Sequence, residues 1–190
     1  MKYADGTKQL KSMRKQITKL REDMRKVQAG IAPEPVAEYS FETAKGAVSL
    51  DGLFGDAKEL IVIHNMGMGC NYCTLWADGY NGLYPHLANR AAFAVVTPDA
   101  PAKQAAFAKS RGWQFPMVSD SGSSFAADMG YTGEKGGRTP GISVFQKRGK
   151  SVVRVSDTGE GPYDDFCALW HLFDMLPEGA KGWQPRVSYA

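Results

Sequence analysis

The sequence has few cysteines and no long apolar run, and both features narrow the class of protein. No apolar stretch approaches the roughly 20 residues that cross a bilayer, and the N-terminus lacks the apolar centre of a secretory signal. Three cysteines among 190 residues, two of them in one C-x-x-C motif, suit a reducing compartment and favour a catalytic pair over a structural disulfide. We therefore expect a cytoplasmic protein that does not bind membranes, with export of a longer precursor left open.

The sequence also lacks a second metal-binding pair and a basic face interleaved with aromatic residues. No second C-x-x-C and no H-x-x-x-H accompanies the single motif, which disfavours zinc, and we expect neither a metal nor another cofactor. The net charge of +3 comes largely from one N-terminal segment, so nucleic acid is not an expected partner. With 43% hydrophobic residues, the chain can bury one substantial core.

The chain is organised around residues 60–76, LIVIHNMGMGCNYCTLW. The order of apolar run, glycines and C-x-x-C motif predicts a buried strand, a sharp turn and a helix start. Unpaired N–H groups and the positive end of the helix dipole should lower the pKa of Cys70 from about 8.5 into roughly the 3.5–7.5 range. Cys73, one turn later, can attack the mixed disulfide that Cys70 forms. The motif predicts a thiol–disulfide oxidoreductase with Cys70 as the nucleophile and Cys73 as the resolving thiol.

An amphipathic helix is expected at residues 8–28. Its apolar residues recur at alternating spacings of three and four, which is typical of a narrow helical seam: Leu10, Met13, Ile17, Leu20, Met24 and Val27. The seam is too short for a confident stand-alone coiled coil, so packing on its own domain and an arm for homodimerisation both stay open. Gly30 and the Pro-Glu-Pro segment at 33–35 should end it. We expect residues 1–35 to form an arm and linker, and residues 36–190 to form one domain.

The rest of the chain predicts an α/β fold around a mixed sheet flanked by helices. Asp99 is expected to cap a helix that ends at Gly112, and Pro85 should kink or interrupt the helix that follows the cysteines. The other expected elements are hairpins at 39–50 and 142–155, strands at 92–96 and 113–120, a helical turn at 124–129 and a closing helix at 166–176.

This order of elements resembles the thioredoxin superfamily, with a strand, C-x-x-C at a helix start, a strand, a helix, and a proline before a hairpin. The resemblance implies that Pro140 is cis and faces the cysteines. It further implies that the adjoining backbone at Thr139 is free to pair with an extended substrate. An ordinary trans turn proline is the alternative.

Five segments are also similar to a bacterial family of predicted dithiol-disulfide oxidoreductases, known as a domain of unknown function. They are CNYCTLWADGYNG, GWQFPMVSD, SSFAADMG, TPGISVF and LWHLFDMLPEG. Together with the charged N-terminal helix they cover most of the chain, in order. This resemblance implies the fold and the redox pair, and it supplies no substrate; the expected partner is a protein or small-molecule thiol or disulfide.

Two positions depart from thioredoxin in ways that bear on mechanism. Six residues before the first cysteine, where thioredoxins carry a buried aspartate, this chain has His64. His64 is expected to act as general base for Cys73, or else to be a hydrogen-bonded histidine at a strand end. A glycine replaces the tryptophan that precedes the first cysteine of thioredoxins, so Tyr72 or Trp76 is expected to border the substrate instead.

Two further readings stay open. FPMVSD followed by a short helix resembles the peroxiredoxin branch, and Arg138 lies where peroxiredoxins hold an arginine near their reactive cysteine. The Pro-x-x-x-Thr-x-x-Cys signature is absent, however, so a thiol peroxidase is an alternative. Arg138 is expected to be either an accessory residue of the site or a solvated loop residue. A non-catalytic dimeric redox-sensing or binding module is the third class. Cys167, which could share a helical stripe with His171 and Asp174, is expected to be a packed core residue.

Overall fold

The computed structural model describes residues 1–189. Its contacts divide the chain into two compact units, Met1–Pro33 and Glu34–Ala190, so the division falls after Pro33, whereas the sequence placed it after Pro35. Glu34 and Pro35 form strand β1 (Glu34–Pro35), which pairs with β8 (Ser151–Gly159) in the second unit. Each unit is described by itself below.

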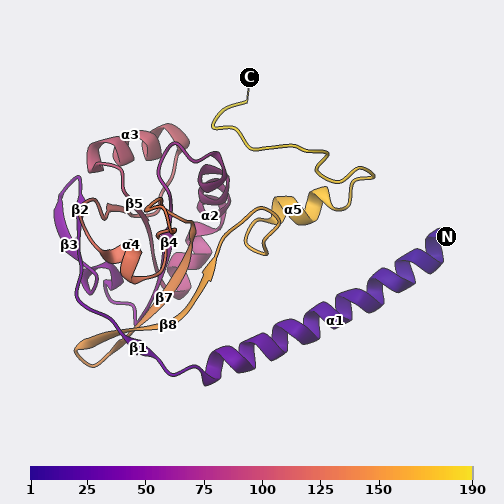
Figure 1. Ribbon diagram of the computed structural model, residues 1–190, viewed down its shortest axis with the longest axis horizontal. Coiled ribbons are helices and arrows are strands. Elements are labelled where there is room, and N and C mark those ends of the chain that lie inside the picture. Colours follow the sequence, from indigo (N-terminus) through magenta and orange to yellow (C-terminus); the bar gives the residue numbers. More distant parts are fainter. Residues whose placement is uncertain (190) are drawn as a thin grey trace. The chain divides into compact units, whose positions relative to one another are not determined.

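The first unit is essentially one helix, α1 (Tyr3–Gly30), which confirms the predicted N-terminal helix (Figure 1). No residue of α1 is buried in the described chain. The six apolar seam residues are between 47% and 69% exposed, with Ile17 at the lower end and Met24 and Val27 at the upper end. Within the first unit, the seam is therefore an exposed apolar stripe that no other element packs against.

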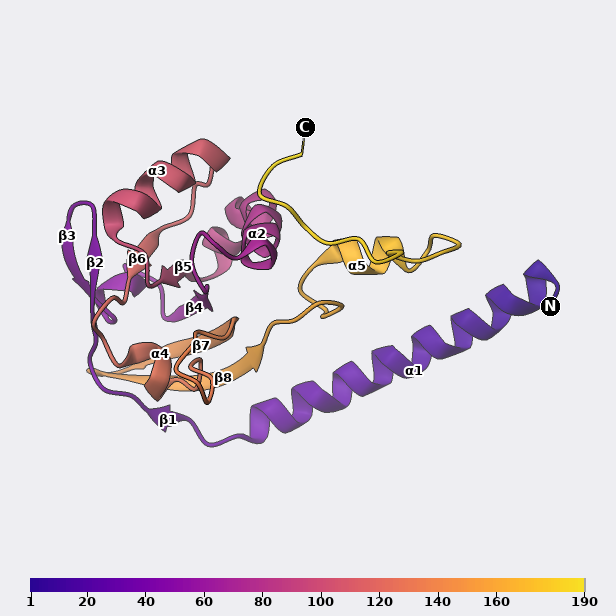
Figure 2. The same cartoon turned by 45° about the horizontal axis from the view of Figure 1, so that its top comes forward.

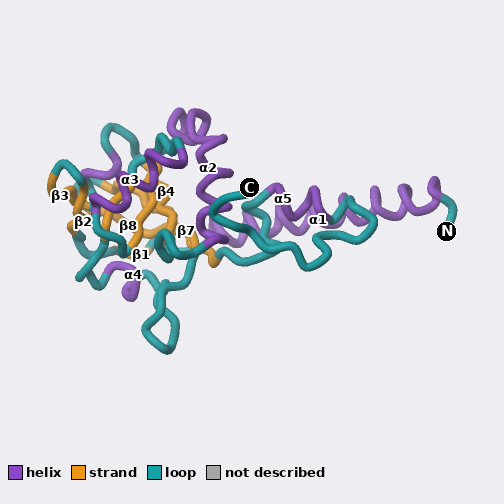
Figure 3. The backbone as a smooth tube through the Cα atoms, turned by 90° about the horizontal axis from the view of Figure 1, so that it is seen from above, coloured by secondary structure: helices purple, strands orange, loops and turns teal. Residues whose placement is uncertain are grey.

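The described residues of the second unit form one eight-stranded mixed sheet in the order β1-β8-β7-β4-β5-β6-β2-β3. Figure 3 shows its strands in orange. Neighbouring β4, β5 and β6 run parallel and the remaining pairs are antiparallel. Both predicted hairpins are present. The other strands are β2 (Ser40–Thr43), β3 (Gly46–Ser49), β4 (Glu59–His64), β5 (Ala92–Thr97), β6 (Met117–Ser119) and β7 (Gly141–Arg148).

Helices cover both faces of the sheet, and the alternation of β4 shows which side chains meet them. Ile63 packs with the helices α2 (Asn71–Arg90) and α3 (Pro101–Arg111), which Figure 2 shows on the same side of the sheet. Leu60 and Val62 point the other way, toward the short helix α4 (Phe125–Asp128). A 3-10 turn (Gly52–Phe54) and α5 (Ala168–Phe173) complete the unit.

Three element predictions differ in detail from the structure. The N-cap of α3 is Ala100 rather than Asp99, because a proline occupies the first helical position, where its missing N–H costs nothing. Helix α2 is not interrupted at Pro85, because Tyr84 and Leu87 on either side of it pack on the same apolar cluster. The alternative, a kink at Pro85, stays a prediction. The closing helix is shorter than expected, because the Asp164 carboxylate accepts the N–H groups that precede it.

None of the helices in the described chain is long and apolar enough to cross a membrane.

Candidate active site

The loop that delivers the cysteines is held by two side chains. The Asn65 amide oxygen accepts the Gly67 N–H at 2.8 Å, and an Asp99 carboxylate oxygen accepts the Met68 N–H at 2.9 Å. Gly67 has φ +109, and a Cβ there would lie 2.9 Å from Asp99 Oδ2, so only glycine fits without a shift. Asp99, expected as a helix cap, thus fixes the turn before the thiols instead.

Cys70 is the N-cap residue of α2, which confirms the predicted position of the thiol at a helix start. The thiol is partly exposed, and its Sγ accepts the backbone N–H of Cys73 at 3.1 Å. The hydrogen bond from the Cys73 thiol, helped by the backbone N–H groups of Tyr72 and Cys73, outweighs burial and lowers the pKa of Cys70 to about 7. Near neutral pH, a substantial share of Cys70 is therefore the nucleophilic thiolate.

Cys73 lies one turn further along α2 and is only 3% exposed. The hydrogen bond to Cys70, then burial, then the negative charges of Cys70 and Glu160 raise the pKa of Cys73, while the Met66 backbone acts in the opposite direction. Cys73 is therefore a buried, protonated thiol one helical turn after the partly ionised Cys70. This asymmetry suits an exposed nucleophile and a buried resolving thiol.

Of the two aromatic residues expected to border the substrate, only Tyr72 is placed for it. Trp76 is 2% exposed, and its indole N–H donates to Asp164 at 3.4 Å, so the expectation that it faces substrate was wrong. Trp76 is buried because it faces the core from the inner side of α2. Tyr72 is half-buried beside Cys70, with its ring 6.1 Å from that of Trp76 and 6.2 Å from that of Trp170.

His64 does not join the cysteines. Its ring stacks on Tyr131 at 3.8 Å and on Phe125 at 5.3 Å, and its Nε2 lies 2.9 Å from the Ser143 hydroxyl. These partners belong to the face of the sheet opposite Ile63 and Cys73. Burial, followed by the charges of Arg138 and Arg154, lowers the pKa of His64 to about 3, so the ring is neutral. The structure therefore gives His64 the alternative expected role of a hydrogen-bonded histidine at a strand end, and not that of base for Cys73.

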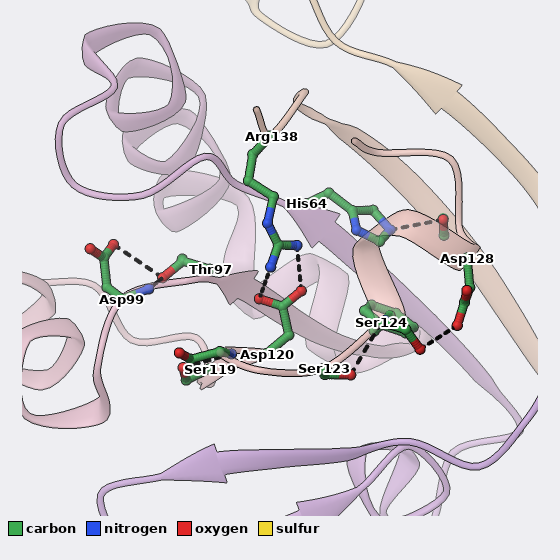
Figure 4. Close-up of polar contacts among 12 residues, drawn as sticks. His64, Thr97, Asp99, Ser119, Asp120, Ser123, Ser124, Asp128 and Arg138 are labelled. Atoms are coloured by element: carbon green, nitrogen blue, oxygen red, sulfur yellow. Dashed lines mark hydrogen bonds and ion pairs between the residues drawn. The ribbon is translucent and has the colours of Figure 1, made fainter. Parts of the chain in front are cut away.

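Arg138 is not a solvated loop residue, which was one of the two roles expected for it. Its guanidinium forms a two-point ion pair with Asp120, at 2.6 and 3.0 Å, and Figure 4 shows the two side chains pointing at each other beside His64. Asp120 is 1% exposed and would carry an uncompensated buried charge without Arg138. The groups that set the pKa of Cys70 lie in its own helical turn. Arg138 therefore pairs with Asp120 and is not among the groups that shift the pKa of Cys70.

Pro140 and Thr139 do not form the expected substrate edge. All peptide bonds in the described chain are trans, so the implied cis bond at Pro140 is absent. The Thr139 N–H donates to the Tyr131 carbonyl at 3.0 Å, and the Pro140 carbonyl accepts the Glu160 N–H at 3.1 Å. Both backbone groups are therefore already paired within the fold, because β7 starts as an inner strand of the sheet.

Sequence reasoning missed the acidic groups near the thiols. Glu160, just after β8, is 9% exposed and accepts a hydrogen bond from the hydroxyl of Tyr80, which is 7% exposed on α2. Burial first, and the charges of Asp164 and Cys70 next, raise the pKa of Glu160 to about 7, while the bond from Tyr80 lowers it. The sequence around Glu160, an acidic residue after a glycine in a loop, does not predict its burial. The residue that binds its side chain, Tyr80, is far away in the sequence.

Cys167 is a core residue, as expected. It is 7% exposed at the N-cap of α5 and shares an apolar cluster with Cys73 and Trp170. Burial raises the pKa of its thiol. The suggested stripe with His171 does not form, because His171 is exposed and lies 3.5 Å from Asp165. Across residues 1–189, no three His, Cys, Asp or Glu side chains are grouped to hold a metal ion.

Comparison with known proteins gives a family and a fold. A family model described as bacterial protein of unknown function (DUF899) matches residues 2–188. No curated protein matches the chain significantly.

Solved structures that are similar to about two thirds of the chain include peroxiredoxins. Peroxidoxin BcpB from Mycobacterium tuberculosis has a TM-score of 0.60 and 21% identity, covering 72% of this chain and 88% of that one. A variant of peroxiredoxin Q from Xanthomonas campestris has a TM-score of 0.55 and 18% identity, covering 65% and 81%. The mitochondrial 2-cys peroxiredoxin from Plasmodium falciparum has a TM-score of 0.54 and 14% identity, covering 69% and 83%. These similarities confirm the thioredoxin-like α/β fold.

Proposed function

We propose that this chain, which belongs to the bacterial protein family DUF899, is a thiol–disulfide oxidoreductase. In this reaction Cys70 attacks the substrate disulfide and Cys73 resolves the mixed disulfide. The observation that carries the proposal is the position of Cys70 Sγ as the cap of α2, 3.1 Å from the Cys73 N–H, with the Cys73 thiol as its second donor. A thiolate held by donors at a helix N-terminus is both stabilised and open to attack a sulfur.

The reaction follows from the asymmetry of the pair. The Cys70 thiolate attacks one sulfur of a substrate disulfide, which forms a mixed disulfide and releases the other substrate half as a thiolate. Cys73 then loses its proton and attacks Cys70 Sγ, so the Cys70–Cys73 disulfide forms and the second substrate thiolate leaves. The two electrons that reduce the substrate come from the dithiol, and an external dithiol restores it. Tyr72, beside Cys70, borders the incoming disulfide.

The test is to separate the two thiols by substitution. With a small aromatic disulfide as substrate, Cys70→Ser should abolish turnover and trap nothing, whereas Cys73→Ser should accumulate a mixed disulfide visible by intact mass. Cys167→Ala is the matched control and should keep activity, because Cys167 has no role in the reaction. Equal residual activity in the Cys70 and Cys73 variants would contradict the assigned roles.

A thiol peroxidase is the second candidate, since the similar solved structures are peroxiredoxins. In that reaction the Cys70 thiolate would attack a peroxide oxygen, giving a sulfenic acid and an alcohol or water, and Cys73 would condense with the sulfenic acid. Arg138 is held by Asp120 and leaves the thiolate without a guanidinium partner from that residue. We therefore expect hydrogen peroxide to oxidise Cys70 at a rate close to that of free cysteine, and a rate orders of magnitude faster would favour the peroxidase.

A further inference from the structure

The buried carboxyl group of Glu160 interacts electrostatically with the redox pair and has no role in the steps above. Glu160 follows β8 directly, and its N–H donates to the Pro140 carbonyl at 3.1 Å, which fixes its backbone at the start of β7. Its side chain accepts the Tyr80 hydroxyl and is shielded from solvent. Burial disfavours the charged form of a carboxyl group. A carboxyl group is therefore usually buried only where it is hydrogen-bonded or takes part in the protein's chemistry.

The carboxyl group is electrostatically connected to both thiols. The negative charge of Glu160 raises the pKa of Cys73, and the negative charge of Cys70 raises the pKa of Glu160. Tyr80, which binds Glu160, lies on the same buried stripe of α2 as Cys73, with Ala77 between them at helical spacing. One helix face therefore carries the resolving thiol and the hydroxyl that orients the acid.

The chemistry of the second step needs a proton acceptor here. Cys73 is buried and protonated, and a thiol must become a thiolate before it attacks a disulfide. Once Cys70 is bonded to the substrate in the mixed disulfide, its sulfur no longer carries a charge and cannot accept the proton of Cys73. Bulk water is a weak base and has little access to a residue that is 3% exposed.

The other titratable groups around Glu160 are less suited to this task. The Asp164 carboxylate already accepts from the N–H groups of Gly161, Phe166 and Cys167 and from the Trp76 indole. The pKa of Tyr80 and that of Cys167 are both raised by burial, so both groups keep their own protons. His64 lies on the far face of the sheet.

We infer that Glu160 accepts the proton of the Cys73 thiol during resolution of the mixed disulfide, with Tyr80 as the residue that positions its carboxyl group. This inference rests on the proposed oxidoreductase function. The proton passes from Cys73 Sγ to a Glu160 oxygen, the Cys73 electron pair forms the new S–S bond to Cys70, and the bond between Cys70 and the substrate sulfur breaks with its electrons on the leaving thiolate. Glu160 later returns the proton to solvent or to the leaving thiolate.

The role predicts a pH profile for the second step alone. Glu160 acts as a base only when ionised, so the resolution rate should rise with pH through the pKa of Glu160. That pKa is raised to about 7 while Cys70 is a thiolate, and it should lie lower in the mixed disulfide, where the negative charge of Cys70 is absent. The hydrogen bond from Tyr80 lowers that pKa, so removal of the hydroxyl should move the midpoint of the profile to higher pH.

The experiment is stopped-flow reaction of the reduced full chain with excess dithiobis(nitrobenzoate), with Cys167→Ala in every sample so that the third thiol gives no signal. Attack by Cys70 releases one nitrothiobenzoate in a phase that depends on reagent concentration. Attack by Cys73 releases the second in a phase that does not. Glu160→Gln should keep the first phase and slow the second by on the order of ten- to a hundredfold near pH 7.5, and the rise of the second-phase rate with pH should be lost.

Three variants make the result specific. Glu178→Gln is the matched control, because Glu178 is exposed and pairs with Lys181; it should leave both phases unchanged. Glu160→Asp should recover part of the second phase, and Tyr80→Phe should keep it with a profile shifted to higher pH. Should Glu160→Gln fail to fold by circular dichroism, an unshifted Tyr80→Phe profile overturns the inference.

The failure of this inference is distinguishable from that of the proposed function. A second phase with unchanged rate and pH profile in Glu160→Gln would overturn the role of Glu160 and leave the oxidoreductase intact. If the unsubstituted pair shows no second phase at any pH, or if the first phase survives in Cys70→Ser, the proposed function and this inference both fall.

Discussion

At the scale of single residues, the two thiols control each other. The largest effect that lowers the pKa of Cys70 is the hydrogen bond from the Cys73 thiol, and the same bond is the largest effect that raises the pKa of Cys73. A donor shared in this way keeps one thiol ready to attack and the other protonated until it is needed. The helix turn contributes through backbone N–H groups that no substitution at Cys73 removes.

Replacing Cys73 with alanine should therefore raise the pKa of Cys70 from about 7 toward the value of an ordinary thiol. The backbone N–H groups remain, so part of the lowering should persist. The measurement is the rate of Cys70 alkylation by iodoacetamide as a function of pH, in a Cys167→Ala background. The Cys167→Ala protein with an intact pair is the control. An unchanged midpoint in the Cys73→Ala protein would show that the thiol–thiol hydrogen bond has no influence on Cys70.

His64 should make the protein sensitive to acid. Its folded-state pKa of about 3 lies below the unfolded value of 6.5, so the unfolded state binds the extra proton between these pH values. The stability that His64 contributes is present above pH 6.5 and is lost as the pH falls toward 3. We expect the free energy of unfolding to fall by about 2 kcal/mol more between pH 7 and pH 5 in the unsubstituted protein than in His64→Gln, measured by urea denaturation. The exposed His86 and His171 are present in both proteins. Parallel pH dependences would mean that His64 takes up its proton without unfolding.

At the scale of elements, the start of β7 leaves no room for a side chain at Gly141. A Cβ on Gly141 would stand 2.0 Å from the Tyr131 ring and 2.6 Å from the Thr158 carbonyl oxygen. Tyr131 cannot move aside easily, because its hydroxyl donates to the Ile142 and Thr158 carbonyls at 2.7 and 3.1 Å. The strand itself is paired on both sides, to β4 and β8.

We expect Gly141→Ala to lower the free energy of unfolding by about 3 kcal/mol, at the upper end of the usual cost of overpacking. Gly137→Ala is the matched control, because a Cβ there meets nothing within 4 Å; its stability should change little. Urea denaturation of the two variants gives the comparison. Similar midpoints for both would mean that the sheet relaxes around the new methyl group.

The same elements show what the sequence could predict. The position of Cys70 at a helix start depends on neighbouring residues only, a glycine turn and the motif itself, and it was predicted correctly. His64 failed because strand alternation turned it to the other face, although its distance in sequence from Cys70 matched thioredoxin. The free backbone expected at Thr139 failed because Tyr131 provides an acceptor that only the folded chain brings near. Glu160 was missed because Tyr80, 80 residues away, forms its environment.

At the scale of the whole molecule, the apolar seam of α1 has no assigned binding partner. Its six residues follow the three- and four-residue spacing of a helix that pairs with another helix, and at least 47% of the surface of each one is exposed. The second unit carries its own sheet and two apolar clusters. We therefore expect the seam to bind the seam of a second copy of the chain and to form a homodimer.

Ile17→Lys tests this dimer in the full chain. A lysine at the centre of the seam would remove an apolar contact worth about 1.5–3 kcal/mol from each of two copies, so the dimer should dissociate at least a hundredfold more readily. Thr18→Lys is the control, because Thr18 lies off the seam and this substitution introduces the same charge as Ile17→Lys. Sedimentation velocity across micromolar concentrations should show a dimer for the unsubstituted and Thr18→Lys proteins and a monomer for Ile17→Lys. Redox turnover should be equal in all three proteins, since the thiols belong to the other unit. If turnover falls when the dimer dissociates, the N-terminal helix takes part in the reaction, as a redox-sensing dimer requires.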